Sequence, residues 1–228
     1  MRIYHGTTLS RAIRIQSEGF QFQGMDEILQ DISFHHSFPI EELRAILKFR
    51  FAMTDERDGF VCFTDDFQQA SSYAQRAPEI QWEALTQIYR QRHNLGADWN
   101  LSNELHWWVT KQMMHDPPVV IEIKTDSKKM YRGGLLSDEY RHPTPFHEMS
   151  IIKIHPISRW VDFDLLRFIT GYENKDRMDF IRLVEDGCWG QYVIKHPLHN
   201  HQWCLEEIIE RCSVERKIQL GILSIDEA

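Results

Sequence analysis

The chain has 228 residues, of which 42% are apolar and 26% are charged, and its formal net charge is −8 at pH 7. This length and composition suit one large domain, or a domain with an extension, that buries a hydrophobic core. The acidic balance argues against a general polyanion-binding surface. No window approaches the roughly 18 apolar residues of a membrane span, and no secretory leader opens the chain. We therefore expect a cytoplasmic protein that has no contact with a membrane.

The cysteines are few and scattered. The four of them show no disulfide framework, which suits a reducing compartment: Cys62, Cys188, Cys204 and Cys212.

A short strand near the N-terminus carries the first candidate functional residues. Ile3 and Tyr4 are apolar, His5 has a ring with two hydrogen-bonding nitrogens, and Gly6 allows a ligand to approach the backbone closely. A helix over residues 11–18 should follow, capped by Thr8 or Ser10 and ended by Gly19, with Ala12, Ile13 and Ile15 facing inward.

The next segments alternate between loop, helix and strand. Residues 21–40 predict a loop and residues 41–51 a helix. Residues 59–64 read as a strand, followed by a helix over residues 67–77. At 100° per residue, one face of this helix should carry small residues that let it lie close to a sheet, together with one tyrosine: Ala70, Tyr73, Ala74 and Ala77.

A helical insertion with several tryptophans is expected over about residues 79–116. The two helices around residues 80–93 and 102–115 should use most of these tryptophans for packing. Residues 119–124 are the clearest strand of the chain, and residues 125–147 form a turn-rich excursion. A strand over residues 146–154 follows, with Glu148 at its entrance.

The region after residue 160 is expected to be helical, with helices over residues 161–170, 177–185 and 205–212 and a polar tail. Cysteines and histidines gather in it, and these residue types suit zinc. They lack the paired spacing of familiar zinc sites, so we expect no metal site, although metal binding stays open for the cluster Cys188, His196, His199, His201, Cys204 and Cys212.

Three motifs, in this order, resemble the ADP-ribosyltransferase superfamily, in the branch with a His-Tyr-Glu triad. They are Tyr4-His5-Gly6-Thr7 with the later Gly19-Phe20, residues 59–64 with the helix that carries Tyr73, and residues 146–151 with Pro156-Ile157. The resemblance implies an α+β fold with a split β-sandwich core. It places a catalytic domain at residues 1–159, with the helical insertion, and leaves residues 160–228 as a helical C-terminal extension.

The resemblance also implies roles around NAD, the ADP-ribose donor. His5 would donate to a ribose hydroxyl, and the Gly6 backbone would pair with the nicotinamide carboxamide. Tyr73 would stack on the nicotinamide ring. Glu148, aimed at the ribose 2′-OH, would stabilise the oxocarbenium-like sugar as the bond breaks. Three further residues are assigned to the NAD site: Thr7, Phe63 and Thr64.

The target is less sharply indicated than the donor. Relatives that modify arginine carry Glu or Gln two residues before the catalytic Glu, whereas Phe146 stands there in this chain. That residue could instead stack against a base, and Arg132 and Arg141 could contact the target. We therefore favour RNA or DNA over protein as the target, in the toxin of a toxin–antitoxin or antiphage defence system, with an antitoxin or chaperone protein as a further partner.

Three alternatives stay open. The first is a transferase that modifies a protein. The second is an RNA 2′-phosphotransferase, which also opens with a His-Gly motif and uses NAD, although it calls for several basic residues that converge on an RNA phosphate. The third is a catalytically inactive binding module with the same fold.

Overall fold

The computed structural model describes residues 1–21, 25–46, 60–76, 79–95, 102–132, 139–147, 149–161, 163–171, 193–196 and 199–225. The chain forms two compact units, of which one comprises Met1–Trp99 and Met113–Ile157 and the other Asn100–Gln112 and Ser158–Ala228. Both contain helices and strands, so the fold class is α+β. Among the helices described, none is both long enough and apolar enough to cross a bilayer.

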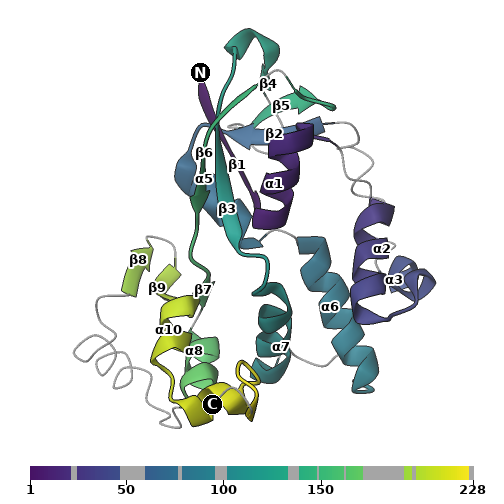
Figure 1. Ribbon diagram of the computed structural model, residues 1–228, viewed down its shortest axis with the longest axis vertical. Coiled ribbons are helices and arrows are strands. Elements are labelled where there is room, and N and C mark those ends of the chain that lie inside the picture. The colour runs from purple at the N-terminus through teal and green to yellow at the C-terminus, as the bar shows by residue number, and fades with distance from the viewer. Residues whose placement is uncertain are drawn as a thin grey trace. The chain divides into compact units, whose positions relative to one another are not determined.

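The first unit is built on a six-stranded antiparallel sheet in the order β4-β5-β2-β1-β3-β6 (Figure 1). The predicted strands at the N-terminus and at residues 119–124 are confirmed, as is the strand predicted over residues 59–64, of which residues 60–64 are described. The segment expected to be turn-rich also contributes a 3₁₀ turn, η2 (Ser127–Lys129), and two strands. The strands are β1 (Arg2–Thr8), β2 (Phe60–Thr64), β3 (Pro118–Lys124), β4 (Tyr131–Arg132), β5 (Glu139–Pro143) and β6 (Ser150–Pro156).

Side chains alternate between the two faces of the sheet along each strand, and among the described helices α1 (Leu9–Glu18) packs on one face and α5 (Phe67–Arg76) on the other. Ile3 of β1 lies opposite Ile123, and both belong to the core under α1. Gly6 lies opposite Val120 on the other face, where Ala70 and Ala74 of α5 pack. The prediction that small residues bring this helix close to the sheet is confirmed.

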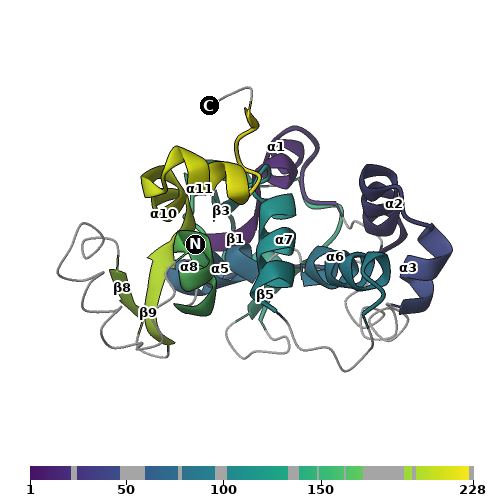
Figure 2. The same cartoon turned by 90° about the horizontal axis from the view of Figure 1, so that it is seen from below.

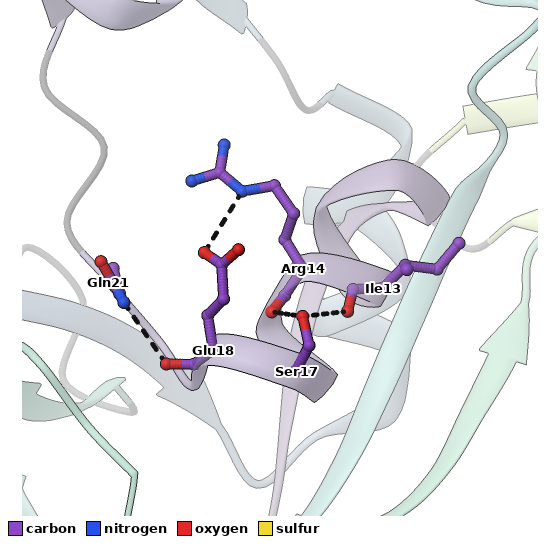
Figure 3. A network of polar contacts seen from close by, with 5 residues as sticks. All are labelled: Ile13, Arg14, Ser17, Glu18 and Gln21. Atoms are coloured by element: carbon purple, nitrogen blue, oxygen red, sulfur yellow. Dashed lines mark hydrogen bonds and ion pairs between the residues drawn. The ribbon is translucent and has the colours of Figure 1, made fainter.

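The outer face of α1 carries local polar contacts, drawn in Figure 3. The Ser17 hydroxyl donates to the Arg14 carbonyl at 3.0 Å, and the Arg14 guanidinium lies 3.7 Å from the Glu18 carboxylate. Such exposed pairs contribute little to stability. Ile13 is on this side with 56% of its surface exposed, so the expectation that it faces inward is wrong; Ala12 does face inward and is fully buried.

Three helices of the first unit pack against one another: α2 (Met25–His36), α3 (Ile40–Ile46) and α6 (Glu79–Arg92) (Figures 1 and 2). The expectation of a loop over residues 21–40 is therefore wrong. Leu29 and Ile32, three residues apart, are buried on one face of α2, and their burial stabilises the helix. The mixed composition of this segment gave no clear helical pattern in the sequence.

The second unit combines α7 with elements from the C-terminal part of the chain. Trp107 of α7 is buried, and its indole N–H donates to the Leu220 carbonyl at 3.2 Å. The sequence did not predict the three-stranded sheet, which has the order β7-β9-β8. It also did not predict the helix α11, which lies where we expected a polar tail. The predicted helix over residues 177–185 lies outside the described residues. The elements are α7 (Asn103–Met113), β7 (Trp160–Val161), α8 (Phe163–Thr170), β8 (Val193–His196), β9 (His199–Cys204), α10 (Leu205–Arg211) and α11 (Val214–Gln219).

Candidate active site

His5 is held at the point where two strands stop pairing. β1 and β2 are paired through Tyr4 and Thr64, and the register between these two described strands continues no further. One residue beyond, His5 Nδ1 lies 2.9 Å from the carbonyl oxygen of Cys62. The side chain of His5 thus forms a hydrogen bond to β2 just beyond the point where backbone pairing between the two strands ends.

The protonation state of His5 follows from its surroundings. Burial lowers its pKa from 6.5 to about 4, against the opposing effect of the Cys62 carbonyl and with a smaller lowering by Arg11. The ring is therefore neutral near pH 7. Because a carbonyl can only accept, the proton is on Nδ1, and Nε2 carries a lone pair. In this conformation His5 offers a ligand hydroxyl a hydrogen-bond acceptor, whereas we expected it to act as a donor.

Aromatic rings surround His5 on the α1 face. Its ring centroid is 4.9 Å from that of Phe20, edge to face, and 5.6 Å from that of Phe63. Phe20 is joined to Phe146 by two backbone hydrogen bonds of 3.0 and 2.8 Å. The second half of the first motif, Gly19-Phe20, therefore connects His5 to the segment that leads to Glu148.

Gly6 is required for packing. A Cβ on Gly6 would lie 2.6 Å from the backbone nitrogen of Ala74 and would also overlap the carbonyl of Ala70, both on α5. We expected the missing side chain to make room for a ligand; it makes room for a helix.

Several residues assigned to the NAD site or to the target serve the core in this conformation. Thr7 and Phe63 are buried. Thr64 is buried too, and its hydroxyl donates to Gln69 and accepts from the Asp66 backbone N–H at 3.1 Å, at the start of α5. Phe146 is 1% exposed and stacks on His142 with centroids 3.8 Å apart. Its proposed role as a platform for a base is therefore corrected, because the ring has no open face.

Tyr73 lies on α5 with 36% of its surface exposed, and its hydroxyl donates to Glu139 Oε1 at 3.3 Å. Glu139 is the residue that the sequence analysis missed. It is 5% exposed and is the cross-strand partner of Thr64, and its second oxygen, Oε2, has no hydrogen-bond partner among the described residues. Its flanking sequence shows no apolar alternation, so nothing marked it as part of a strand.

The two arginines expected to contact the target lie on opposite faces of the sheet. Arg141 is the cross-strand partner of Tyr131, and Arg132 is the partner of Tyr140, which packs on the α1 face. Arg141 shares the α5 face with Glu139, two residues before it, and its Nε is buried without a hydrogen-bond partner in the described part of the chain. The structure does not bring the two arginines together.

Glu148 lies outside the described residues. The residues on either side of it are described: Phe146 is bonded to Phe20, the Met149 backbone N–H donates to the His147 carbonyl at 2.9 Å, and β6 begins at Ser150.

In comparisons of the chain with protein-family models, with curated proteins and with solved structures, nothing matches. The resemblance therefore depends on the motifs alone.

The candidate residues fall into two groups. His5 joins Phe20, Phe63 and Phe146 on the α1 face, whereas Tyr73, Glu139 and Arg141 gather on the α5 face. No three metal-ligating side chains come together among the described residues, and the side chains of Cys188, His196, His199 and His201 lie outside that part. Chemically, the described residues offer a neutral imidazole acceptor, a partly exposed phenol ring, a buried carboxyl group and a guanidinium.

Proposed function

We propose that this protein is a mono-ADP-ribosyltransferase that transfers ADP-ribose from NAD to a macromolecule, with a core of the ADP-ribosyltransferase type. The observation that carries the proposal is the neutral His5, fixed by Cys62 where β1 and β2 part, with a lone pair on Nε2. A ribose hydroxyl is a donor that suits this acceptor.

The remaining roles follow from the chemistry of the reaction. Breaking the bond between nicotinamide and ribose creates positive charge on the sugar, which a carboxylate stabilises. We assign that carboxylate to Glu148. Tyr73 has a partly exposed ring that can stack on nicotinamide, and Arg141 offers a cation for a phosphate group. We favour nucleic acid as the target. Because Phe146 is buried, this preference now depends on the basic residues around β4 and β5.

The test uses the purified chain and two labels on NAD. Label on nicotinamide measures cleavage of the donor. Label on the adenine half, followed into a cell lysate and then treated with nuclease or with protease, identifies the class of target. We expect nicotinamide release and transfer of adenine label that nuclease removes. Label removed only by protease would support a protein target.

Glu148→Gln is the decisive variant, with Glu18→Gln on the exposed face of α1 as the matched control. Loss of charge stabilisation in the transition state predicts a fall in turnover of roughly a hundredfold to a thousandfold for Glu148→Gln and no change for Glu18→Gln. Nicotinamide release that requires a 2′-phosphorylated RNA would support the phosphotransferase instead. If a folded wild-type chain neither binds NAD nor releases nicotinamide, the proposal fails.

A further inference from the structure

The contact between Tyr73 and Glu139 joins elements that are distant in the sequence. Tyr73 is on α5 and Glu139 is the first residue of β5, 66 positions later, and Glu139 Oε1 accepts from the Tyr73 hydroxyl at 3.3 Å. The carboxyl group is buried beside Thr64, whereas the tyrosine has 36% of its surface exposed. The buried partner is therefore the fixed one, and the exposed ring is the one that it orients.

Stability alone does not account for a carboxyl group at this position. Buried polar atoms in proteins nearly always have hydrogen-bond partners, and a buried carboxyl group normally uses both oxygens. Glu139 Oε2 has none among the described residues, and no ion pair joins Glu139 to Arg141 on the same face of β5. An apolar side chain of similar size would avoid this cost. Local rules of this kind are broken mostly at functional sites.

We propose that Glu139 is a positioning residue, which holds the hydroxyl of Tyr73 and thereby fixes the ring at the height and angle needed to stack on the nicotinamide of NAD. This inference rests on the proposed function. Each rotatable side-chain torsion that a ligand has to order reduces affinity when the ligand binds. The bond to Glu139 would impose that order before NAD arrives.

The experiment is a double-mutant cycle. Tyr73→Phe removes the hydroxyl and keeps the ring; Glu139→Leu removes the acceptor and keeps the approximate volume; Glu139→Gln keeps an oxygen that can accept. The dissociation constant for NAD is measured by calorimetry, and KM and kcat by nicotinamide release. We expect Tyr73→Phe and Glu139→Leu each to raise the dissociation constant and KM by roughly 3- to 10-fold, as expected for one hydrogen bond. The double variant should be no worse than either single variant, and Glu139→Gln should stay within about twofold of wild type.

Thermal unfolding separates positioning from a purely structural role. Because Glu139→Leu removes a buried oxygen that has no partner, its unfolding midpoint should equal or exceed that of the wild type while NAD binding weakens. If Glu139→Leu does not fold, Tyr73→Phe decides the question, since it removes the same bond and keeps the aromatic ring.

The measured affinities distinguish the positioning role from the proposed function. Unchanged affinity for NAD in Tyr73→Phe, or additive losses in the double variant, overturns the positioning role and leaves the proposed function standing. A folded wild-type chain that does not bind NAD overturns both.

Discussion

The neutral ring of His5 makes a prediction about pH. The pKa of His5 is about 4 in the folded protein, while an unfolded histidine titrates near 6.5. Between these values the unfolded chain binds a proton that the folded chain does not bind, so folding loses stability as the pH falls from about 6.5 to about 4. The loss should reach about 3 kcal/mol at most. Urea unfolding at several pH values across this range measures it.

The control for this prediction is His5→Asn. The asparagine amide can donate to the Cys62 carbonyl as Nδ1 does, but it does not titrate. We expect the variant to lose the part of the pH dependence that His5 contributes. An identical pH profile in both proteins would show that His5 is not the group responsible. Because Asn also lacks the Nε2 acceptor, the same variant should bind NAD more weakly.

At the scale of elements, Gly6 decides how closely α5 approaches the sheet. In Gly6→Ala the new Cβ meets the backbone of Ala70 and Ala74, which cannot move without shifting the helix. We expect a loss of stability of about 3 kcal/mol or more. Ser72→Ala, a change of similar size on the exposed face of α5, should change stability by less than about 0.5 kcal/mol. Chemical denaturation of both variants tests this. Unchanged stability in Gly6→Ala would favour a glycine kept only for a ligand.

The N-terminus of α1 is capped from a distant part of the sequence. Asp116 accepts from the Ser10 backbone N–H at 2.8 Å and from its hydroxyl at 2.6 Å. Burial would raise the pKa of Asp116, but the hydrogen bonds from Ser10 and Thr8 lower it below its ordinary value. The bonded carboxylate therefore stabilises the fold at neutral pH, and the contribution is lost in acid as the pH falls through this lowered pKa.

We therefore expect Asp116→Ala to cost about 1 to 2 kcal/mol at pH 7. Ser10→Ala should cost less, because the backbone N–H still donates to the carboxylate. Both differences should shrink as the pH falls below the ordinary range of an aspartate and through the lowered pKa of Asp116. Urea unfolding at a series of pH values from 7 downward into acid measures them. A loss in Asp116→Ala that is independent of pH would contradict the capping role.

The sequence predicted correctly those helices and strands whose own residues show a clear periodicity or capping signal. The strand of apolar residues at 119–124 and the helix after Thr64 carry their own periodicity and start signals, and both are where we expected them. β5 has no such pattern. It is a strand because β2 offers a hydrogen-bonding edge, which is information that resides elsewhere in the chain.

The candidate site shows the same division. The motif around His5 was visible in the sequence, but the direction of its hydrogen bond depends on the Cys62 carbonyl, 57 positions away. The role of Gly6 depends on α5, and Glu139 had no local signal at all. Residue identity predicted which groups could matter, and tertiary contacts determined what each of them does.

At the scale of the whole molecule, the two units are not consecutive stretches of chain. Residues 100–112 belong with residues 158–228, so a fragment that ends at residue 159 retains α7 without its partners. Trp107 would lose the Leu220 carbonyl and its burial in this fragment. We expect the fragment 1–159 to show red-shifted tryptophan emission and a tendency to aggregate, whereas the fragment 1–224 should behave as the full chain. A fragment 1–159 that unfolds cooperatively with native emission would contradict this.

The bond between Trp107 and Leu220 also has a consequence for biosynthesis. The two residues are 113 positions apart. At a translation rate of about 5 to 20 residues per second, Trp107 is synthesised roughly 6 to 23 seconds before its partner. During that interval the Trp107 side chain lacks the acceptor that it has in the folded chain, which leaves time for a chaperone to bind this segment. The order of synthesis thus leaves α7 without its C-terminal partners until the last part of the chain has been made.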